Sequence, residues 1–109
     1  MTMETLTRLE ETIRSRRAAG GPDSYVAQLN NRGLPVIARK LGEEATETIV
    51  AALSGSNEEL TGEAADLLFH LTVLLDNMGV PLADVMAELE RREGTSGIAE
   101  KAARTTDAD

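Results

Sequence analysis

The feature that most constrains the fold of this chain is a pair of apolar stretches with helical periodicity, residues 35–53 and 57–78. Their apolar side chains occupy much of the helix circumference: Ile37, Leu41, Ile49 and Leu53 in one, and Leu60, Leu67, Leu68, Leu71, Leu74 and Leu75 in the other. Helices of this kind belong inside a bundle. No segment shows the strict alternation of a half-buried strand, so the predicted fold class is all-α.

Cap and turn residues mark where the helices begin and end. Ser56 and Glu59 have the spacing of a capping box, which predicts that a helix starts at about residue 57. Gly79 would end that helix, and Pro35 suits the first turn of the helix over residues 35–53. The same signals predict helices over about residues 5–17, over a short segment after Ser24, and over about residues 81–92.

The composition excludes several classes of function. The chain has 109 residues, no cysteine and a formal net charge of −8, which repels nucleic-acid phosphates. One Phe and one Tyr are too few to stack bases, so we expect no nucleic-acid partner. Charged residues interrupt the apolar runs, and we therefore expect a cytoplasmic protein with no membrane contact. The modest core of a chain this short favours a homodimer.

Acidic residues at helical spacing are the candidate functional residues. Glu44 and Glu47 lie about one turn apart in one long stretch, and Glu63 and Asp66 do so in the other. If the two helices are antiparallel neighbours, as their short connection favours, the pairs can face each other around a cation. Glu43, beside Glu44, is either a further candidate metal ligand or a group that supports the ligands.

A solvated acidic face is the alternative interpretation of these residues, and it is common on helices. Two observations favour a cation. Like charges at these spacings destabilise a helix, and the sequence has no Lys or Arg between Gly42 and Glu90 to compensate them. Oxygen ligands without cysteine indicate Mg²⁺ or Mn²⁺, because Ca²⁺ is less suited to phosphate chemistry.

Two neighbouring side chains are candidate substrate-binding residues with two interpretations each. His70, four residues after Asp66, is either a catalytic base or a buried supporting group, the commoner role of a single His among leucines. Lys40 precedes Glu43 by three residues, so it either forms an intrahelical ion pair or binds a phosphate group beside the metal. The sequence alone leaves both alternatives open.

Two motifs resemble those of a known enzyme superfamily. Residues 40–47, KLGEEATE, and residues 63–70, EAADLLFH, look like the ExxE and ExxD signature of the all-α nucleotide pyrophosphohydrolases. The flanking segments SYVAQL, residues 24–29, and SGIAEKAAR, residues 96–104, resemble those of the phosphoribosyl-ATP pyrophosphatase family. The resemblance follows the order of the chain and covers nearly all of it.

This resemblance implies a fold, a metal and a reaction. The fold would be a MazG-like four-helix bundle, usually completed by homodimerisation, whose acidic motifs bind Mg²⁺. The residues at the metal-binding and catalytic positions would be Glu44, Glu47, Glu63 and Asp66. The reaction would be hydrolysis of phosphoribosyl-ATP to phosphoribosyl-AMP and diphosphate, the second step of histidine biosynthesis.

The segment after the last predicted helix is where we expect selectivity for the phosphoribosyl group. Gly97 can adopt a positive φ and bring backbone N–H groups to a phosphate, while Lys101 and Arg104 would share one face of a helical turn. The chain would then consist of a helical domain, residues 1–94, and a C-terminal substrate-binding segment, residues 95–109, with a disordered end. The alternative is a loosely ordered, solvated tail.

Two other functions compete with this one. A house-cleaning pyrophosphohydrolase of the same superfamily would share the metal site but act on a free nucleoside triphosphate. Such an enzyme would not need Lys101 and Arg104. A non-catalytic helical adaptor would bind a basic partner through its acidic faces and would need no metal.

Overall fold

The computed structural model of the protein describes residues 2–21, 23–94 and 97–104. This part of the chain forms six α-helices and no strand, which confirms the predicted all-α class. The helices are α1 (Thr2–Ala19), α2 (Tyr25–Arg32), α3 (Leu34–Ser54), α4 (Asn57–Met78), α5 (Leu82–Arg92) and α6 (Gly97–Arg104). The end that the sequence predicts to be disordered, residues 105–109, lies outside the described residues.

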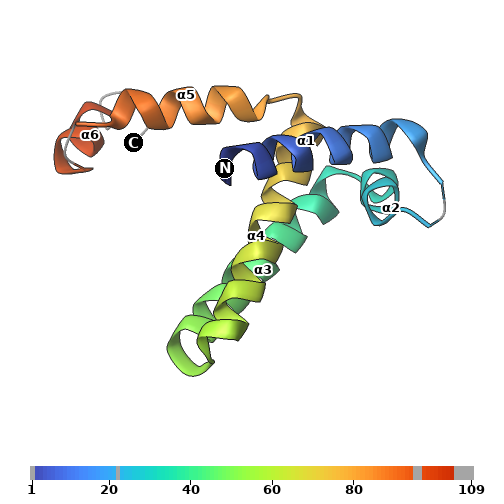
Figure 1. Ribbon diagram of the computed structural model, residues 1–109, viewed down its shortest axis with the longest axis horizontal. Helices are drawn as coiled ribbons and strands as arrows, with labels where there is room; N and C mark the ends of the chain where they lie inside the picture. Colours follow the sequence, from blue (N-terminus) through green and yellow to red (C-terminus); the bar gives the residue numbers. More distant parts are fainter. Residues whose placement is uncertain (1, 22, 95–96, 105–109) are drawn as a thin grey trace.

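The long helices α3 and α4 form an antiparallel pair that makes up one limb of the molecule (Figure 1). Helix α1 crosses the end of this pair that lies away from the α3–α4 turn, and α2 packs against both α1 and α3. Helix α5 leaves the end of α4 and extends away from the pair, with α6 at its far end. The chain therefore forms a two-helix limb, α3 and α4, and a layer of α1 and α2 across one end of it, while most of α5 extends away from both.

Local capping explains why the helices begin and end where the sequence predicts. The Ser56 side chain accepts a hydrogen bond from the Glu59 backbone, and the Glu59 side chain accepts one from the Ser56 N–H, which completes the capping box of α4. Gly79 ends α4 in the left-handed region at a φ of 73°. The Ser24 hydroxyl caps α2 by accepting a hydrogen bond from the Ala27 N–H.

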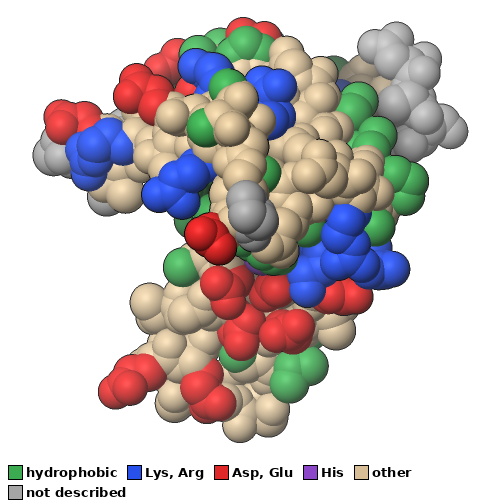
Figure 2. Space-filling view, turned by 90° about the vertical axis from the view of Figure 1, so that its right-hand side faces the viewer, with side chains coloured by type: hydrophobic (Ala, Val, Ile, Leu, Met, Phe, Trp, Pro, Cys, Tyr) green, Lys and Arg blue, Asp and Glu red, His purple; other side chains and the backbone are tan. Residues whose placement is uncertain are grey.

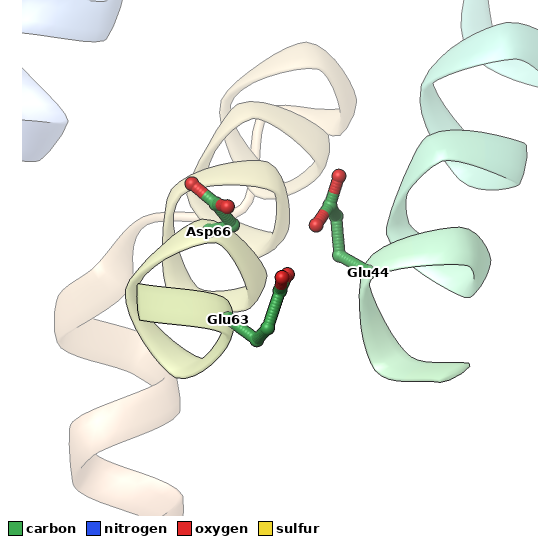
Figure 3. A group of neighbouring side chains, drawn as sticks. All are labelled: Glu44, Glu63 and Asp66. Carbon is green, nitrogen blue, oxygen red and sulfur yellow. The ribbon is translucent and has the colours of Figure 1, made fainter. Parts of the chain in front are cut away.

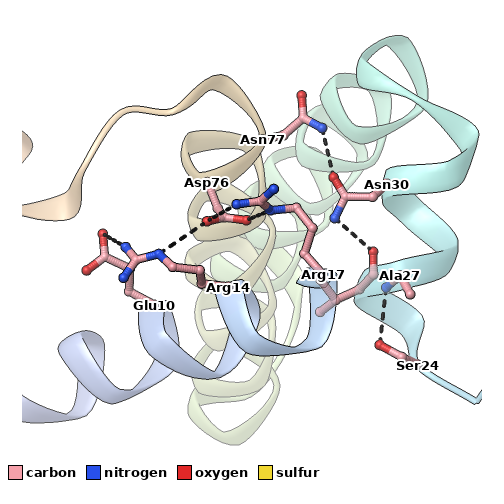
Figure 4. Close-up of polar contacts among 9 residues, drawn as sticks. Glu10, Arg14, Arg17, Ser24, Ala27, Asn30, Asp76 and Asn77 are labelled. Atoms are coloured by element: carbon pink, nitrogen blue, oxygen red, sulfur yellow. Dashed lines mark hydrogen bonds and ion pairs between the residues drawn. The ribbon is translucent and has the colours of Figure 1, made fainter. Parts of the chain in front are cut away.

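The core lies where α1 and α2 meet the ends of α3 and α4. Its buried members are Ile13, Val26, Leu29, Ile37 and Val73. Around it, a polar network attaches α1 to α4: the Arg17 guanidinium donates to the carboxylate of Asp76, whose side chain is 5% exposed (Figure 4). Glu10 accepts a hydrogen bond of 2.7 Å from the Leu82 backbone N–H and so holds the start of α5.

A single chain leaves much apolar surface uncovered. Its accessible surface is 7522 Å², whereas a compact monomer of 11.7 kDa exposes about 5900 Å². The exposed large apolar side chains lie on several helices and include Ile49, Val50, Leu53, Leu68, Met78 and Leu89. No single helix in the described ranges is long and apolar enough to cross a membrane. Helices α4 and α5, with a bend of 111° between them, reach the necessary length and apolar composition only when the two are taken together.

Candidate metal centre

The centre is built where α3 and α4 run side by side, midway along the limb. Glu44 comes from α3, and Glu63 and Asp66 come from α4 (Figure 3). Each of these residues offers a carboxylate oxygen, and the oxygens lie within 4.8 Å of one another. The antiparallel pairing thus turns two separate sequence motifs into one acidic group, as the short turn between the helices predicts.

Two oxygens of this group are buried without a hydrogen-bond partner in the described part of the chain, Oε2 of Glu44 and Oε1 of Glu63. Buried polar atoms in proteins almost always have a partner, and a buried carboxylate without one is costly. A divalent cation among these oxygens would supply the missing interaction. The residues present therefore fit a hard cation that prefers oxygen ligands.

Glu47 is not among the three residues whose oxygens converge, but it is close enough to Glu63 to influence its charge. The pKa of Glu63 is raised from its ordinary value, first by burial and then by the negative charges of Glu47, Asp66 and Glu44. The carboxylates of the ExxE and ExxD motifs are therefore close enough to raise the pKa of Glu63 by repulsion. A bound cation would instead lower that pKa, because its positive charge favours the ionised carboxylate.

Glu43 and Lys40 lie at the edge of the centre. Glu43 is not in the group of converging oxygens; its carboxylate pairs with Lys40 Nζ at 3.3 Å and with Arg39 Nε at 3.6 Å. The pKa of Lys40 is raised mainly by the hydrogen bond to Glu43, and also by Tyr25 and Glu44. Acidic side chains gather over the α3–α4 limb with basic ones directly beside them (Figure 2). Such an edge can receive an anionic ligand.

His70 is a buried residue whose two ring nitrogens are both engaged. Its Nδ1 lies 2.8 Å from the backbone oxygen of Asp66, and its Nε2 lies 2.8 Å from the hydroxyl of Tyr25. Only 6% of His70 is exposed, and its ring packs edge-on against those of Tyr25 and Phe69. This geometry favours the supporting role over that of a freely accessible base.

Two residues at the centre have no place in the sequence prediction. In the sequence, Tyr25 is only one residue of the segment SYVAQL, and nothing in that segment predicts a hydrogen bond between its hydroxyl and His70. Thr48 donates from its hydroxyl to the backbone oxygens of Glu44, at 2.8 Å, and of Glu63, at 3.2 Å. A threonine four residues after an acidic residue carries no signal of a contact across helices.

The predicted C-terminal binding residues lie on α6, apart from this centre (Figure 1). Lys101 and Arg104 are both in the last turn of α6, so the predicted helical turn is present. Gly97 is the first residue of α6 and is not among the described glycines with a positive φ. Its role in binding a phosphate stays a prediction. Gly94, in the turn after α5, adopts the left-handed conformation, at a φ of 79°.

Comparison with known proteins agrees with this geometry. Residues 6–93 match the sequence model of the family described as phosphoribosyl-ATP pyrophosphohydrolase, a range that contains the whole centre and stops before α6. The chain is 66% identical to the phosphoribosyl-ATP pyrophosphatase of Rhizorhabdus wittichii over 92% of this chain and 94% of that one. It is 64% identical to the enzyme of the same name from Erythrobacter litoralis, over 94% and 98% of the two chains.

A more distant relative gives the same result. The phosphoribosyl-ATP pyrophosphatase of Zymomonas mobilis is 54% identical over 95% of this chain and 97% of its own length. These similarities run through both acidic motifs and through the helices that place them. The chain belongs to the phosphoribosyl-ATP pyrophosphohydrolase family.

Proposed function

We propose that this protein hydrolyses phosphoribosyl-ATP to phosphoribosyl-AMP and diphosphate, the second step of histidine biosynthesis. The relatives described above carry the name of this activity. The observation that carries the proposal for this chain is the convergence of Glu44, Glu63 and Asp66, with two buried oxygens that have no hydrogen-bond partner in the part of the chain that the structure describes. A group of this kind suits the handling of a triphosphate together with a divalent cation. We also propose a cytoplasmic location, which a chain without cysteine suits.

The cation that we propose is Mg²⁺, with Mn²⁺ as a substitute. Glu44, Glu47, Glu63 and Asp66 would hold it, since hard cations of this size prefer carboxylate oxygens. When bound, it would neutralise charge on phosphate oxygens and, as a Lewis acid, polarise a phosphoryl oxygen so that the phosphorus is attacked more easily. Glu43 stays a candidate for an additional ligand, although its carboxylate pairs with Lys40 in this structure.

The protein's own residues would mainly bind and orient the substrate. Lys40 Nζ lies at the edge of the centre, where it can exchange Glu43 for a phosphate oxygen. His70 would help to hold the Asp66 backbone in place, because its ring nitrogens form hydrogen bonds with the backbone oxygen of Asp66 and with the hydroxyl of Tyr25. A carboxylate of the centre that stays ionised could accept the proton of the attacking water, and a bound cation would help by lowering the pKa of that water.

The C-terminal segment, residues 95–109, would hold the phosphoribosyl group beyond the helical domain of residues 1–94. Lys101 and Arg104 supply two positive charges in the last turn of α6, and Gly97 at its start has no side chain to obstruct a ligand. Because α6 lies apart from the centre of its own chain, this role requires either a second copy or a movement of α5 (Figure 1).

A homodimer is the assembly that we propose. One chain exposes about 1600 Å² more than a compact monomer of its mass would. Ile49 and Leu53 are 59% and 82% exposed on α3, and a second copy of the limb would cover them. Burial of this size on each chain would exceed the roughly 800 Å² per partner of a standard interface and fall in the range of obligate homodimers.

A diphosphate-release assay tests the proposed activity directly. The purified protein is given phosphoribosyl-ATP or an ordinary nucleoside triphosphate, each with and without Mg²⁺. We expect release from phosphoribosyl-ATP to exceed release from the triphosphates and to stop when the cation is chelated. Faster release from ordinary triphosphates would favour the house-cleaning function, and no release from any of them would favour the adaptor.

A further inference from the structure

The hydroxyl of Thr48 connects the backbones of the two helices that build the acidic centre. Its Oγ1 lies 2.8 Å from the carbonyl oxygen of Glu44, one turn earlier on α3. The same atom lies 3.2 Å from the carbonyl oxygen of Glu63 on α4. A hydroxyl has one proton, so the two carbonyl oxygens share it. The residues joined in this way are the two whose carboxylates each hold a buried oxygen without a hydrogen-bond partner among the described residues.

Other threonines show why the Thr48 contact differs from ordinary helix chemistry. Thr61 donates to the oxygen of Asn57 and Thr72 donates to that of Leu68, both at the same four-residue spacing. These bonds stay within α4. Thr48 makes the same bond along α3 and a second one to α4, at the level of the centre. The second bond therefore has a consequence that the first does not: it limits the separation of the two helices at this point.

The separation of α3 and α4 matters because the carboxylates of the centre come from both helices. Mg²⁺ accepts only nearly octahedral ligand sets at about 2.0–2.1 Å, so a small shift of one helix removes ligands from its reach. In the metal-free protein the carboxylates also repel one another and would push the helices apart. The Thr48 hydroxyl, which donates to the backbone carbonyl oxygens of Glu44 and Glu63, opposes that repulsion without using a carboxylate oxygen.

We propose that Thr48 is a positioning residue that sets the distance between the acidic motifs of α3 and α4 and thereby the affinity of the centre for its divalent cation. The assignment rests on the metal centre proposed above, and it requires no contact between Thr48 and the substrate. Thr48 would influence cation binding only through the backbones of Glu44 and Glu63, to which its hydroxyl donates. Groups that orient the ligands of a metal in this way commonly change its affinity by about 10- to 100-fold.

Four variants separate this role from ordinary stabilisation. Thr48→Val keeps the branched shape of the side chain and removes the hydroxyl. Thr48→Ala also removes the hydroxyl, leaves a smaller side chain, and replaces the valine variant if that variant does not fold. Thr48→Ser keeps the hydroxyl and should rescue the function. Thr61→Val is the matched control, since it removes a hydroxyl bond of 2.8 Å that stays within α4.

The measurement is the affinity of the full-length protein for Mn²⁺, by calorimetry without substrate, with helical content and thermal melting of the same samples. We expect Thr48→Val and Thr48→Ala to bind Mn²⁺ at least about 10-fold more weakly than the wild type. Thr48→Ser and Thr61→Val should stay within about 3-fold of the wild type, a difference below 1 kcal/mol in binding. The Mg²⁺ concentration that half-activates diphosphate release should rise in the same order.

Two results would overturn the assignment. One is a folded Thr48→Val protein with wild-type Mn²⁺ affinity, even if its melting temperature falls, since that pattern belongs to a merely structural residue. The other is a loss of affinity in Thr61→Val equal to that in Thr48→Val. Because the binding measurement uses no substrate, it decides on Thr48 even if the wild type releases no diphosphate. That outcome would count against the proposed activity alone.

Discussion

The hydroxyl of Tyr25, at the start of α2, lies 2.8 Å from Nε2 of His70 on α4. His70 Nδ1 lies 2.8 Å from the backbone oxygen of Asp66, which can only accept, so Nδ1 carries a proton. In the neutral ring Nε2 is then the acceptor, and Tyr25 donates to it. The pair connects the first turn of α2 to the turn of α4 that carries a carboxylate of the centre.

Removing the hydroxyl of Tyr25 should destabilise the protein by a small, measurable amount. Tyr25→Phe is expected to lower the free energy of unfolding by about 1 kcal/mol, the net contribution of an ordinary hydrogen bond. Tyr25→Leu also loses the stacking on Phe69, whose ring centroid is 6.0 Å away, and should cost more. Urea unfolding of the three proteins measures the difference. Equal stability of Tyr25→Phe and the wild type would show that the hydrogen bond contributes nothing.

Neutralising a carboxylate of the centre should separate stability from activity. Glu63→Gln or Asp66→Asn is expected to lower diphosphate release by more than about 100-fold, because losing a ligand costs more than losing its support. The metal-free variants should melt at a higher temperature than the wild type, since repulsion is relieved. Glu90→Gln, on the exposed surface of α5, is the control and should change neither property. A fully active Asp66→Asn enzyme would refute the metal assignment.

The raised pKa of Glu63 predicts a specific pH dependence in the metal-free protein. Its folded-state pKa lies above the ordinary value of 4.5, so folding favours the protonated carboxyl. The stabilisation is present below pH 4.5 and is lost as the pH rises through the folded-state pKa. Melting curves from pH 4 upward, in a chelating buffer, should therefore show a decline that is weaker in Glu63→Gln. The same decline in both proteins would assign it to other groups.

Dimerisation should make stability depend on concentration. If the exposed face of α3 is covered by a second copy, the melting temperature rises with protein concentration. Ile49→Asp places a charge on that face, where the side chain is 59% exposed in one chain, and should give monomers in light scattering. Thr12→Asp adds the same charge on the exposed surface of α1 and should leave the dimer intact. A wild-type monomer with a concentration-independent melt would exclude the dimer.

The C-terminal segment should affect one substrate and not the other. Changing both Lys101 and Arg104 to Ala is expected to raise KM for phosphoribosyl-ATP by at least about 10-fold, since a lost charge-assisted contact costs about 1.5 kcal/mol or more. Residual hydrolysis of ATP should not change. The control changes Arg8 and Arg16 on α1 to Ala, which removes the same charge elsewhere. An equal effect on both substrates would mean that α6 does not recognise the phosphoribosyl group.

The local features of this protein could be predicted from the sequence because they depend on neighbours along the chain. The capping box of Ser56 and Glu59 and the glycine stop at Gly79 are interactions over a few residues. The placement of Glu63 and Asp66 on one face of a helix follows from the helical repeat alone. Gly97 shows the limit of such reasoning, because the freedom of glycine permits a positive φ without requiring one.

Contacts between helices were decided only by the tertiary structure. The sequence predicts that two acidic pairs exist and that a short turn brings their helices together. It does not determine the rotation of each helix about its axis or their separation, on which the 4.8 Å grouping of Glu44, Glu63 and Asp66 depends. The same variables place the Thr48 hydroxyl against the backbone of Glu63 and Tyr25 against His70. Each depends on packing among residues far apart in the chain, which no local pattern encodes.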